Sequence, residues 1–233
     1  MSNMPRSRNL ADDAHARLRR EIVTGCLLPG AHLSEGTACL RYGLTLAPVR
    51  AALARLRAEG LLHSRPRAGH VVAPITIDDV LELFALRRVL QGHAASLAAG
   101  RAHVEPLRRL ARICDAAMGQ RRAYIQANAA FHRALVRAAD SPRLSRMLDE
   151  LLDHSERIQH LGLSARADRP LPAWRMPLLE QIEAGDSAAA QETMQRHIDN
   201  IRGMAVEALM ANPALRNVQL QPARSSRIRS TKG

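Results

Sequence analysis

Residues 45–72, TLAPVRAALARLRAEGLLHSRPRAGHVV, constrain the fold more than any other part of the chain. Thr45 can cap a helix that tolerates Pro48 in its first turn, because amides there have no partner within the helix. Gly60 can end that helix, since glycine readily adopts the left-handed conformation that closes many helices. The apolar pieces LLHSR and HVVAP can then pair as two strands around the turn PRAG. The stretch therefore predicts a helix followed by a β-hairpin.

Two further helices are predicted upstream of this stretch. Over residues 10–24, apolar side chains four residues apart define one face of a helix. Ser34 is a suitable N-cap for a second helix, which Gly43 can end. Three helices and a small hairpin, with a tight turn between the second and third helices, match the winged helix-turn-helix plan. We therefore expect a DNA-binding domain over residues 10–75.

Residues 76–211 predict a second domain that is entirely helical. Aromatic and strand-forming residues are few, and apolar residues recur at helical spacing. After a first helix that Thr76 can cap, we expect further helices at about residues 105–118, 120–139, 142–162, 172–184 and 187–210. The predicted fold class is thus mainly α, a winged helix-turn-helix followed by an all-helical antiparallel bundle. Residues 212–233 are basic and lack periodicity, and we expect them to be disordered.

Positive charge is concentrated in the first third of the chain. Residues 1–75 hold eleven arginines and five acidic residues, whereas residues 76–212 hold eighteen arginines and seventeen acidic residues. A basic domain beside a nearly neutral one indicates a polyanionic partner for the basic domain alone. The alternative interpretation is a solvated, arginine-rich surface, because Lys232 is the only lysine.

Cysteine usage and hydropathy indicate the compartment. Cys26, Cys39 and Cys114 are odd in number and lack metal-ligand spacing, so we expect buried thiols in a reducing environment. The N-terminus lacks an apolar signal region, and the chain has no stretch of about 18 apolar residues. We therefore expect a cytoplasmic protein without a membrane span.

Six motifs resemble the GntR family of bacterial transcription regulators, in its FadR-like branch with a helical FCD effector domain. Residues 10–74 contain LRREIVTGCLLPGAHLSE, APVRAALARLRAEGLL and RPRAGHVV, and residues 78–205 contain LFALRRVLQGHAASLAA, FHRALVRAADSPRL and IEAGDSAAAQETMQRHI. The resemblance implies a homodimer that binds palindromic, double-stranded operator DNA. It also implies a small effector, commonly a carboxylic acid, that changes the DNA affinity. Since repression relieved by ligand is the commoner behaviour of the family, we expect a repressor.

The resemblance assigns DNA contacts to the start of the third helix and to the wing. The matching positions, which are the expected DNA-binding residues, are Thr45, Leu46, Ala47, Arg50, Arg65, Arg67 and Gly69. The family usually has Ser-Arg-Thr-Pro-Val-Arg at this helix start, so Leu46 and Ala47 replace the arginine and threonine that meet DNA. These side chains can touch a thymine methyl group but cannot bond bidentately to guanine, a contact worth about 1–3 kcal/mol of discrimination. We therefore expect an operator unlike the family's usual one or, alternatively, weakened DNA binding of low specificity.

The resemblance also implies a ligand pocket in the helical domain. Many FCD domains hold a divalent metal with one Asp and three His, and the matching positions here are Asn128, His132, Arg175 and His197. Asparagine lacks the anionic charge and Arg175 adds a fixed positive one, so we expect no metal cofactor, although His132 and His197 remain as ligands if one is bound. We expect Arg175 to hold an effector carboxylate directly, with Asn128, His132 and His197 as hydrogen-bond partners. Arg87 matches a family arginine that can line the same cavity.

Other interpretations of these residues and of the whole chain stay open. Arg175 can also be a surface arginine or part of a salt bridge in the bundle, and each histidine a hydrogen-bonded core side chain. The sequence lacks a nucleophile elbow, a phosphate-binding glycine loop, the H-E-x-x-H motif and the Glu-x-x-His pairs of di-iron bundles, so we do not expect an enzyme. A ligand sensor with a degenerate, low-specificity DNA-binding head is the main alternative to a regulator.

Overall fold

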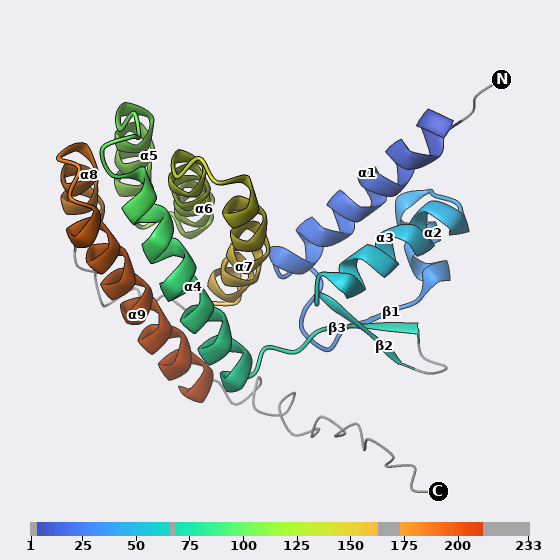
Figure 1. The fold of residues 1–233 in the computed structure, drawn as a ribbon. Coiled ribbons are helices and arrows are strands. Elements are labelled where there is room, and N and C mark those ends of the chain that lie inside the picture. The colour runs from blue at the N-terminus through green and yellow to red at the C-terminus, as the bar shows by residue number, and fades with distance from the viewer. Residues whose placement is uncertain (1–3, 66–68, 163–172, 212–233) are drawn as a thin grey trace, which may run out of the picture.

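Three helices and a small sheet make up the N-terminal part of the chain, which we call the head (Figure 1). The computed structural model describes residues 4–65, 69–162 and 173–211. In chain order the head contains α1 (Met4–Val23), β1 (His32–Leu33), α2 (Glu35–Tyr42), α3 (Leu46–Ala58), β2 (Leu62–Arg65) and β3 (Gly69–Val72). The strands form one antiparallel sheet in the order β1-β3-β2. The predicted hairpin is confirmed, and β1 adds a third strand to it.

Polar and glycine caps delimit the helices of the head. Ser34 Oγ accepts a hydrogen bond from the Thr37 amide at 2.9 Å, which confirms the predicted N-cap of α2. Gly43 follows α2 with a φ of 64°, a left-handed conformation that glycine adopts without steric cost. Thr45 precedes α3 in an extended conformation, but its side chain accepts no hydrogen bond from the helix, so the predicted side-chain cap is wrong. Thr45 is exposed, and water can satisfy the first amides of α3 instead.

Helix α1 begins at Met4, six residues before the predicted start. Pro5 fits this position because its missing amide would be unpaired in the first turn of a helix anyway. The helix packs against α3, and both contribute to an aliphatic core that the sheet closes. The largest fully buried side chains of this core are Leu18, Ile22, Leu33, Leu53, Leu56, Leu61 and Leu62.

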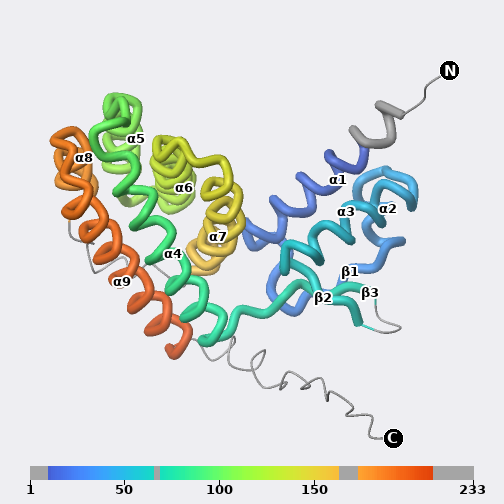
Figure 2. The backbone as a smooth tube through the Cα atoms, in the orientation of Figure 1, coloured from blue at the N-terminus to red at the C-terminus, as the bar shows by residue number. Residues whose placement is uncertain are grey.

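Helices make up the described part of the chain beyond the linker at residues 73–76, and we call this part the bundle. It contains α4 (Ile77–Ala98), α5 (Glu105–Ala116), α6 (Arg121–Ala138), α7 (Pro142–His160), α8 (Arg175–Glu183) and α9 (Ser187–Ala211). Helices α4 and α9 run antiparallel, side by side (Figure 1, Figure 2). The predicted fold class, a mainly α chain with a winged helix-turn-helix head before a helical bundle, is confirmed. The expected disordered tail, residues 212–233, lies outside the described residues.

The first residues of α4 and α8 differ in how they cap their helices. Thr76 caps α4 through a reciprocal pair of bonds, in which its hydroxyl accepts from the Asp79 amide and the Asp79 carboxylate accepts from the Thr76 amide. Helix α8 starts at Arg175 rather than at the predicted residue 172, so Trp174 takes its N-cap position. Residue 172 itself lies outside the described residues.

The apolar side chains of the bundle core are aliphatic apart from a few aromatic rings and one thiol. Phe84, Phe131 and Trp174 pack among leucine, isoleucine and alanine side chains, together with Cys114. Cys26 is exposed because it lies in the turn after α1, and Cys39 is only half-buried, so the expectation of buried thiols is confirmed for Cys114 alone. Within the described ranges, no helix is both long enough and apolar enough to cross a bilayer.

The contact between α4 and α9 can be tested with two glycines. A Cβ atom at Gly92 of α4 would lie 2.9 Å from Gln195 Cγ of α9, whereas a Cβ atom at Gly203 of α9 would meet nothing within 4 Å. We expect Gly203→Ala to raise the free energy of unfolding by about 0.5–1 kcal/mol, because alanine has the higher helix propensity. We expect Gly92→Ala to lower it by about 1–3 kcal/mol, because overpacking outweighs that gain. Urea unfolding followed by circular dichroism measures both, and equal stabilisation by the two would contradict the packing.

Candidate functional site

The exposed end of α3 carries the predicted DNA-binding residues of the third helix. Thr45, Leu46, Ala47 and Arg50 are all exposed there. Arg50 Nε donates to Glu35 Oε1 at 3.0 Å, and Arg50 Nη2 donates to Glu35 Oε2 at 2.9 Å. This bidentate pair orients a guanidinium whose side chain is 62% exposed, and its hydrogen bonds lower the pKa of Glu35. The role of Glu35 in orienting Arg50 was missed from sequence, since the two lie fifteen residues apart.

The other two arginines of α3 contact the head itself. Arg55 Nη1 donates to Asp12 Oδ1 of α1 at 2.5 Å, and Arg57 Nη1 donates to Ser64 Oγ of β2 at 2.9 Å. These contacts brace α3 against the neighbouring helix and strand. The sequence pattern could not separate them from Arg50, which lies at the leading end of the helix.

The wing requires a glycine at its base. Gly69 has a φ of 77°, and a Cβ atom there would lie only 3.1 Å from the carbonyl oxygen of Leu33 on β1. Both the backbone conformation and the close approach therefore select glycine. Arg65 is exposed at the end of β2. Arg67 lies outside the described residues, and contact of any wing residue with DNA stays a prediction.

The five predicted effector-binding side chains come together in the bundle core. Arg87 lies on α4, Asn128 and His132 on α6, Arg175 on α8 and His197 on α9, and all five are buried. Arg175 Nη2 donates to Asn128 Oδ1 at 2.6 Å, and the ring centroids of His132 and His197 are 5.5 Å apart. Arg175 is therefore not a surface arginine, and it forms no salt bridge with any described residue.

A hydrogen-bonded chain fixes the protonation of His132. Arg87 Nε donates to Gln91 Oε1 at 2.9 Å, so the Gln91 amide nitrogen donates to His132 Nδ1 at 3.0 Å. A neutral His132 therefore carries its proton on Nε2. Burial, reinforced by the positive charges of Arg87 and Arg175, lowers the pKa of His132 and His197 well below 6.5, so both imidazoles are neutral at pH 7.

The cluster contains buried donors that lack acceptors. Three atoms that carry protons, His132 Nε2, Trp174 Nε1 and Arg175 Nε, have no hydrogen-bond partner among the described residues. His197 Nε2 is also unpaired. Buried polar groups are nearly always hydrogen-bonded in native proteins, and an unsatisfied one costs about 1–3 kcal/mol. The groups missing from this core are hydrogen-bond acceptors.

Trp174 belongs to the cluster, although it was missed from sequence. Its indole stacks on the His197 ring with centroids 3.5 Å apart and on the His132 ring with centroids 5.4 Å apart. The guanidinium carbon of Arg175 lies 4.9 Å from the indole centroid. The signals that could have found it are its place directly before Arg175 and its being the only tryptophan of the chain.

The side chains at the four matching positions do not fit the metal site that the resemblance implies. Asn128 offers a neutral oxygen that already accepts from Arg175, and His132 Nδ1 accepts from Gln91, which leaves Nε2 protonated. A guanidinium beside the site would repel a cation. Across residues 4–65, 69–162 and 173–211, no group of three His, Cys, Asp or Glu side chains could hold a metal ion. We therefore assign no role to a metal.

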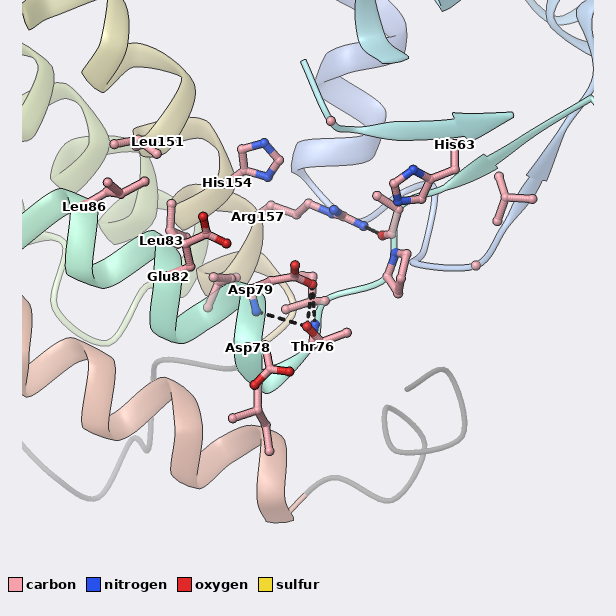
Figure 3. A pocket seen from close by; sticks show the side chains of 18 of the residues that line it. His63, Thr76, Asp78, Asp79, Glu82, Leu83, Leu86, Leu151, His154 and Arg157 are labelled. Carbon is pink, nitrogen blue, oxygen red and sulfur yellow. Dashed lines mark hydrogen bonds between the residues drawn. The ribbon is translucent and has the colours of Figure 1, made fainter. Parts of the chain in front are cut away.

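A cleft of about 1340 Å³ separates the head from the bundle (Figure 3). Acidic and basic side chains line it together, among them His63, Asp78, Asp79, Glu82, His154 and Arg157. Several of them already have partners, since Asp79 bonds to Thr76 and Arg157 donates to the carbonyl oxygen of Ala73. The uncompensated donors around Arg175, which call for a ligand, lie in the bundle core rather than in this cleft.

Three successive residues of α7 connect the head to the buried cluster. Asp153 forms an ion pair with Arg19 of α1. His154 Nε2 lies 3.1 Å from the carbonyl oxygen of the residue that follows α3. Ser155 Oγ accepts from Arg87 Nη1 at 2.5 Å inside the bundle. Helix α7 therefore touches both the head and the buried cluster through neighbouring side chains, an arrangement that the sequence gave no signal for.

The structure defines a class of protein, the transcription regulators. It joins a helix-turn-helix head, whose third helix has an exposed end, to a helical domain with a buried polar cluster. Comparison with known families agrees with this class. Residues 10–72 match the bacterial regulatory proteins of the gntR family, and residues 82–200 match the FCD domain. The chain belongs to the gntR family of transcriptional regulators, and its bundle is an FCD domain.

Related proteins are regulators rather than enzymes. The "Probable D-xylose utilization operon transcriptional repressor" of Paenarthrobacter nicotinovorans is 32% identical over 189 residues, which cover 76% of this chain and 80% of that protein. The HTH-type transcriptional repressor GlaR of Escherichia coli strain K12 is 27% identical over 80% of this chain and 91% of its own. The solved structure of E. coli McbR/YncC has a TM-score of 0.73 at 21% identity, covering 87% of this chain and 99% of that one, and supports the fold.

The neutral imidazoles predict how stability depends on pH. Because the pKa of His132 and His197 lies below 6.5 in the folded chain, the unfolded chain binds more protons as the pH falls through 6.5. We therefore expect each histidine to lower the free energy of unfolding by about 1.4 kcal/mol per pH unit below 6.5. His132→Gln and His197→Gln should each reduce that slope in urea titrations between pH 7.5 and 5, and the exposed His93→Gln is the control. An unchanged slope in both variants would show that the imidazoles protonate in the folded protein.

Proposed function

We propose that this gntR-family regulator is a homodimeric repressor that senses a small organic acid in its bundle. The observation that carries the proposal is the set of buried donors without acceptors around Arg175. A carboxylate supplies acceptor oxygens and negative charge at once, and both are what this core lacks. The relatives named as repressors support the direction of the response.

On the DNA side, we propose that each head of the dimer binds one half of a palindromic operator. Arg50 supplies the base-reading guanidinium, Leu46 and Ala47 supply apolar contacts that suit a thymine methyl group, and Arg65 and Gly69 bring the wing to the backbone. Their exposure on one end of α3 and on the wing supports this assignment. The resulting operator differs from one read by the arginine that the family usually has at the position of Leu46.

For the response to ligand, we propose that α7 carries the signal. A ligand that binds Arg87 competes with Ser155 for the guanidinium, and the neighbouring Asp153 and His154 contact the head. Two positions of α7 would then correspond to two head orientations and, in the dimer, to two spacings of the heads relative to half-sites about one DNA turn apart. The ligand selects the spacing that does not match the operator.

The alternative function is a ligand sensor whose head binds DNA weakly and without sequence preference. The observation that favours it is the replacement of two family DNA contacts by Leu46 and Ala47. Salt dependence separates the two functions, because non-specific binding is almost wholly electrostatic. A chain without residues 212–233 is measured in parallel, since that basic segment can itself attract DNA.

Site selection from a random DNA pool, followed by anisotropy titration, tests the DNA assignment. We expect an enriched palindrome, and we expect Arg50→Ala to weaken its binding by about 5- to 150-fold for each head, as loss of a base contact worth about 1–3 kcal/mol requires. Arg55→Ala is the matched control, because Arg55 lies in the last turn of α3, away from the start of the helix, and pairs with Asp12 of α1. A pool with no enriched palindrome would favour the low-specificity sensor.

The α7 connection is tested with Ser155→Ala, compared with Ser145→Ala on the same helix. A thermal-shift screen of organic acids first identifies a ligand, which stabilises the folded state by mass action. We expect Ser155→Ala to bind operator DNA as the wild type does but to lose about 1 kcal/mol of the coupling between ligand and DNA, a roughly fivefold weaker response. Unchanged coupling in Ser155→Ala would contradict the proposed route.

A further inference from the structure

Two buried guanidiniums of the bundle core have only neutral partners. Arg87 is 1% exposed and donates to Gln91 and Ser155. Arg175 is 9% exposed and donates to Asn128. In the part of the chain that the structure describes, no carboxylate contacts either guanidinium. Burial lowers the pKa of Arg87 to about 9, so this group still carries its charge at pH 7.

Arginines nearer the surface of the same domain do have carboxylate partners. Arg88 pairs with Asp199 at 3.0 Å, and Arg108 pairs with Glu183 at 2.5 Å. Partners are thus present where solvent already screens the charge, and absent in the buried cluster, where an isolated charge is most costly. Arg157, the other buried arginine among the described residues, lies outside the cluster, where it lines the cleft and donates to a backbone carbonyl oxygen. This distribution is expected if the missing negative charge arrives with a ligand.

Both guanidiniums act on the same small volume. The guanidinium carbon of Arg175 lies 4.9 Å from the Trp174 ring centroid, and this indole stacks on the rings of both His132 and His197. Arg87 is also linked to His132 through Gln91. One ligand lying against the imidazoles can therefore reach both cations.

We propose that the effector is a small dianion, a dicarboxylate that places one carboxylate on Arg87 and the other on Arg175. This inference rests on the proposed ligand-sensing function and specifies its ligand. Two carboxylates balance two guanidiniums, and the unpaired donors His132 Nε2 and Trp174 Nε1 bond to the remaining oxygens. A monoanion leaves one buried positive charge without a counterion, which makes it the weaker ligand.

The fluorescence of Trp174 can report ligand binding at this site. Its indole lies against His197 and His132, beside the Arg175 guanidinium, in the space that the ligand would share. A dicarboxylate that bridges the two arginines must shift the indole or take its contacts. Because the chain has no other tryptophan, its fluorescence reports on this site alone.

The experiment titrates the full chain with acids that differ only in the second carboxylate, and follows Trp174 emission. The matched pairs are butyrate with succinate, pentanoate with glutarate, hexanoate with adipate, and gluconate with glucarate. We expect at least one dicarboxylate to change the emission and to bind at least tenfold more tightly than its monocarboxylate partner.

Variants assign the two ends of the ligand. We expect Arg87→Gln and Arg175→Gln each to reduce the affinity of the bound dicarboxylate to that of its monocarboxylate partner, and the double variant to bind neither. Arg87→Lys keeps a positive charge and should keep part of the preference. Arg108→Gln is the control with unchanged affinity, because Arg108 already has Glu183 as its partner. Circular dichroism of each variant verifies that the bundle is folded.

The outcomes separate this inference from the proposed function. Equal affinity within every pair, or no response to any dicarboxylate, overturns the dianion. If a monocarboxylate binds as well as its dicarboxylate partner and releases the operator, the dianion inference is wrong. The proposed repressor function is then unaffected. Lack of site-specific DNA binding by the wild-type chain removes the proposed function, whichever acids bind.

Discussion

The antiparallel contact of α4 with α9 decides what the bundle can hold. It brings Arg87 and Gln91 from one helix into the same core as His197 from the other. The aliphatic side chains around them exclude water. The Arg87 guanidinium is nevertheless charged at pH 7, and its charge therefore lowers the stability of the fold. Natural proteins retain such costly groups mainly at functional sites, where a ligand supplies the missing partner.

The same constraint explains why the cluster is built from donors. The side chains of Arg175 and Trp174 can only donate hydrogen bonds. Because His132 Nδ1 accepts from Gln91, the neutral His132 ring carries its proton on Nε2 and also donates. A metal ion needs lone pairs and negative charge, whereas this core offers protons and positive charge. The departure from the family's metal-ligand pattern is therefore coherent across several side chains rather than confined to one substitution.

Helix α7 contacts both the head and the buried cluster of the bundle. Because successive residues of a helix point in different directions, Asp153 and His154 reach the head while Ser155 reaches Arg87. A shift of α7 by a fraction of its pitch would change all these contacts together. The head and the bundle are thus joined by α7 as well as by the linker, and α7 is the element through which the proposed ligand would act on the head.

The sequence by itself determined the local structure. Capping residues, glycines and apolar spacing are short-range signals, and they were sufficient for the order of helices, the hairpin and the mainly α class. The family pattern located the cluster from Arg87 to His197. Only the tertiary structure decided which groups are partners, because burial and hydrogen bonds join residues far apart in the chain. It paired Arg50 with Glu35, added Trp174 to the cluster, and left the cluster's two guanidiniums, Arg87 and Arg175, without a carboxylate. No spacing along the sequence can reveal these partners.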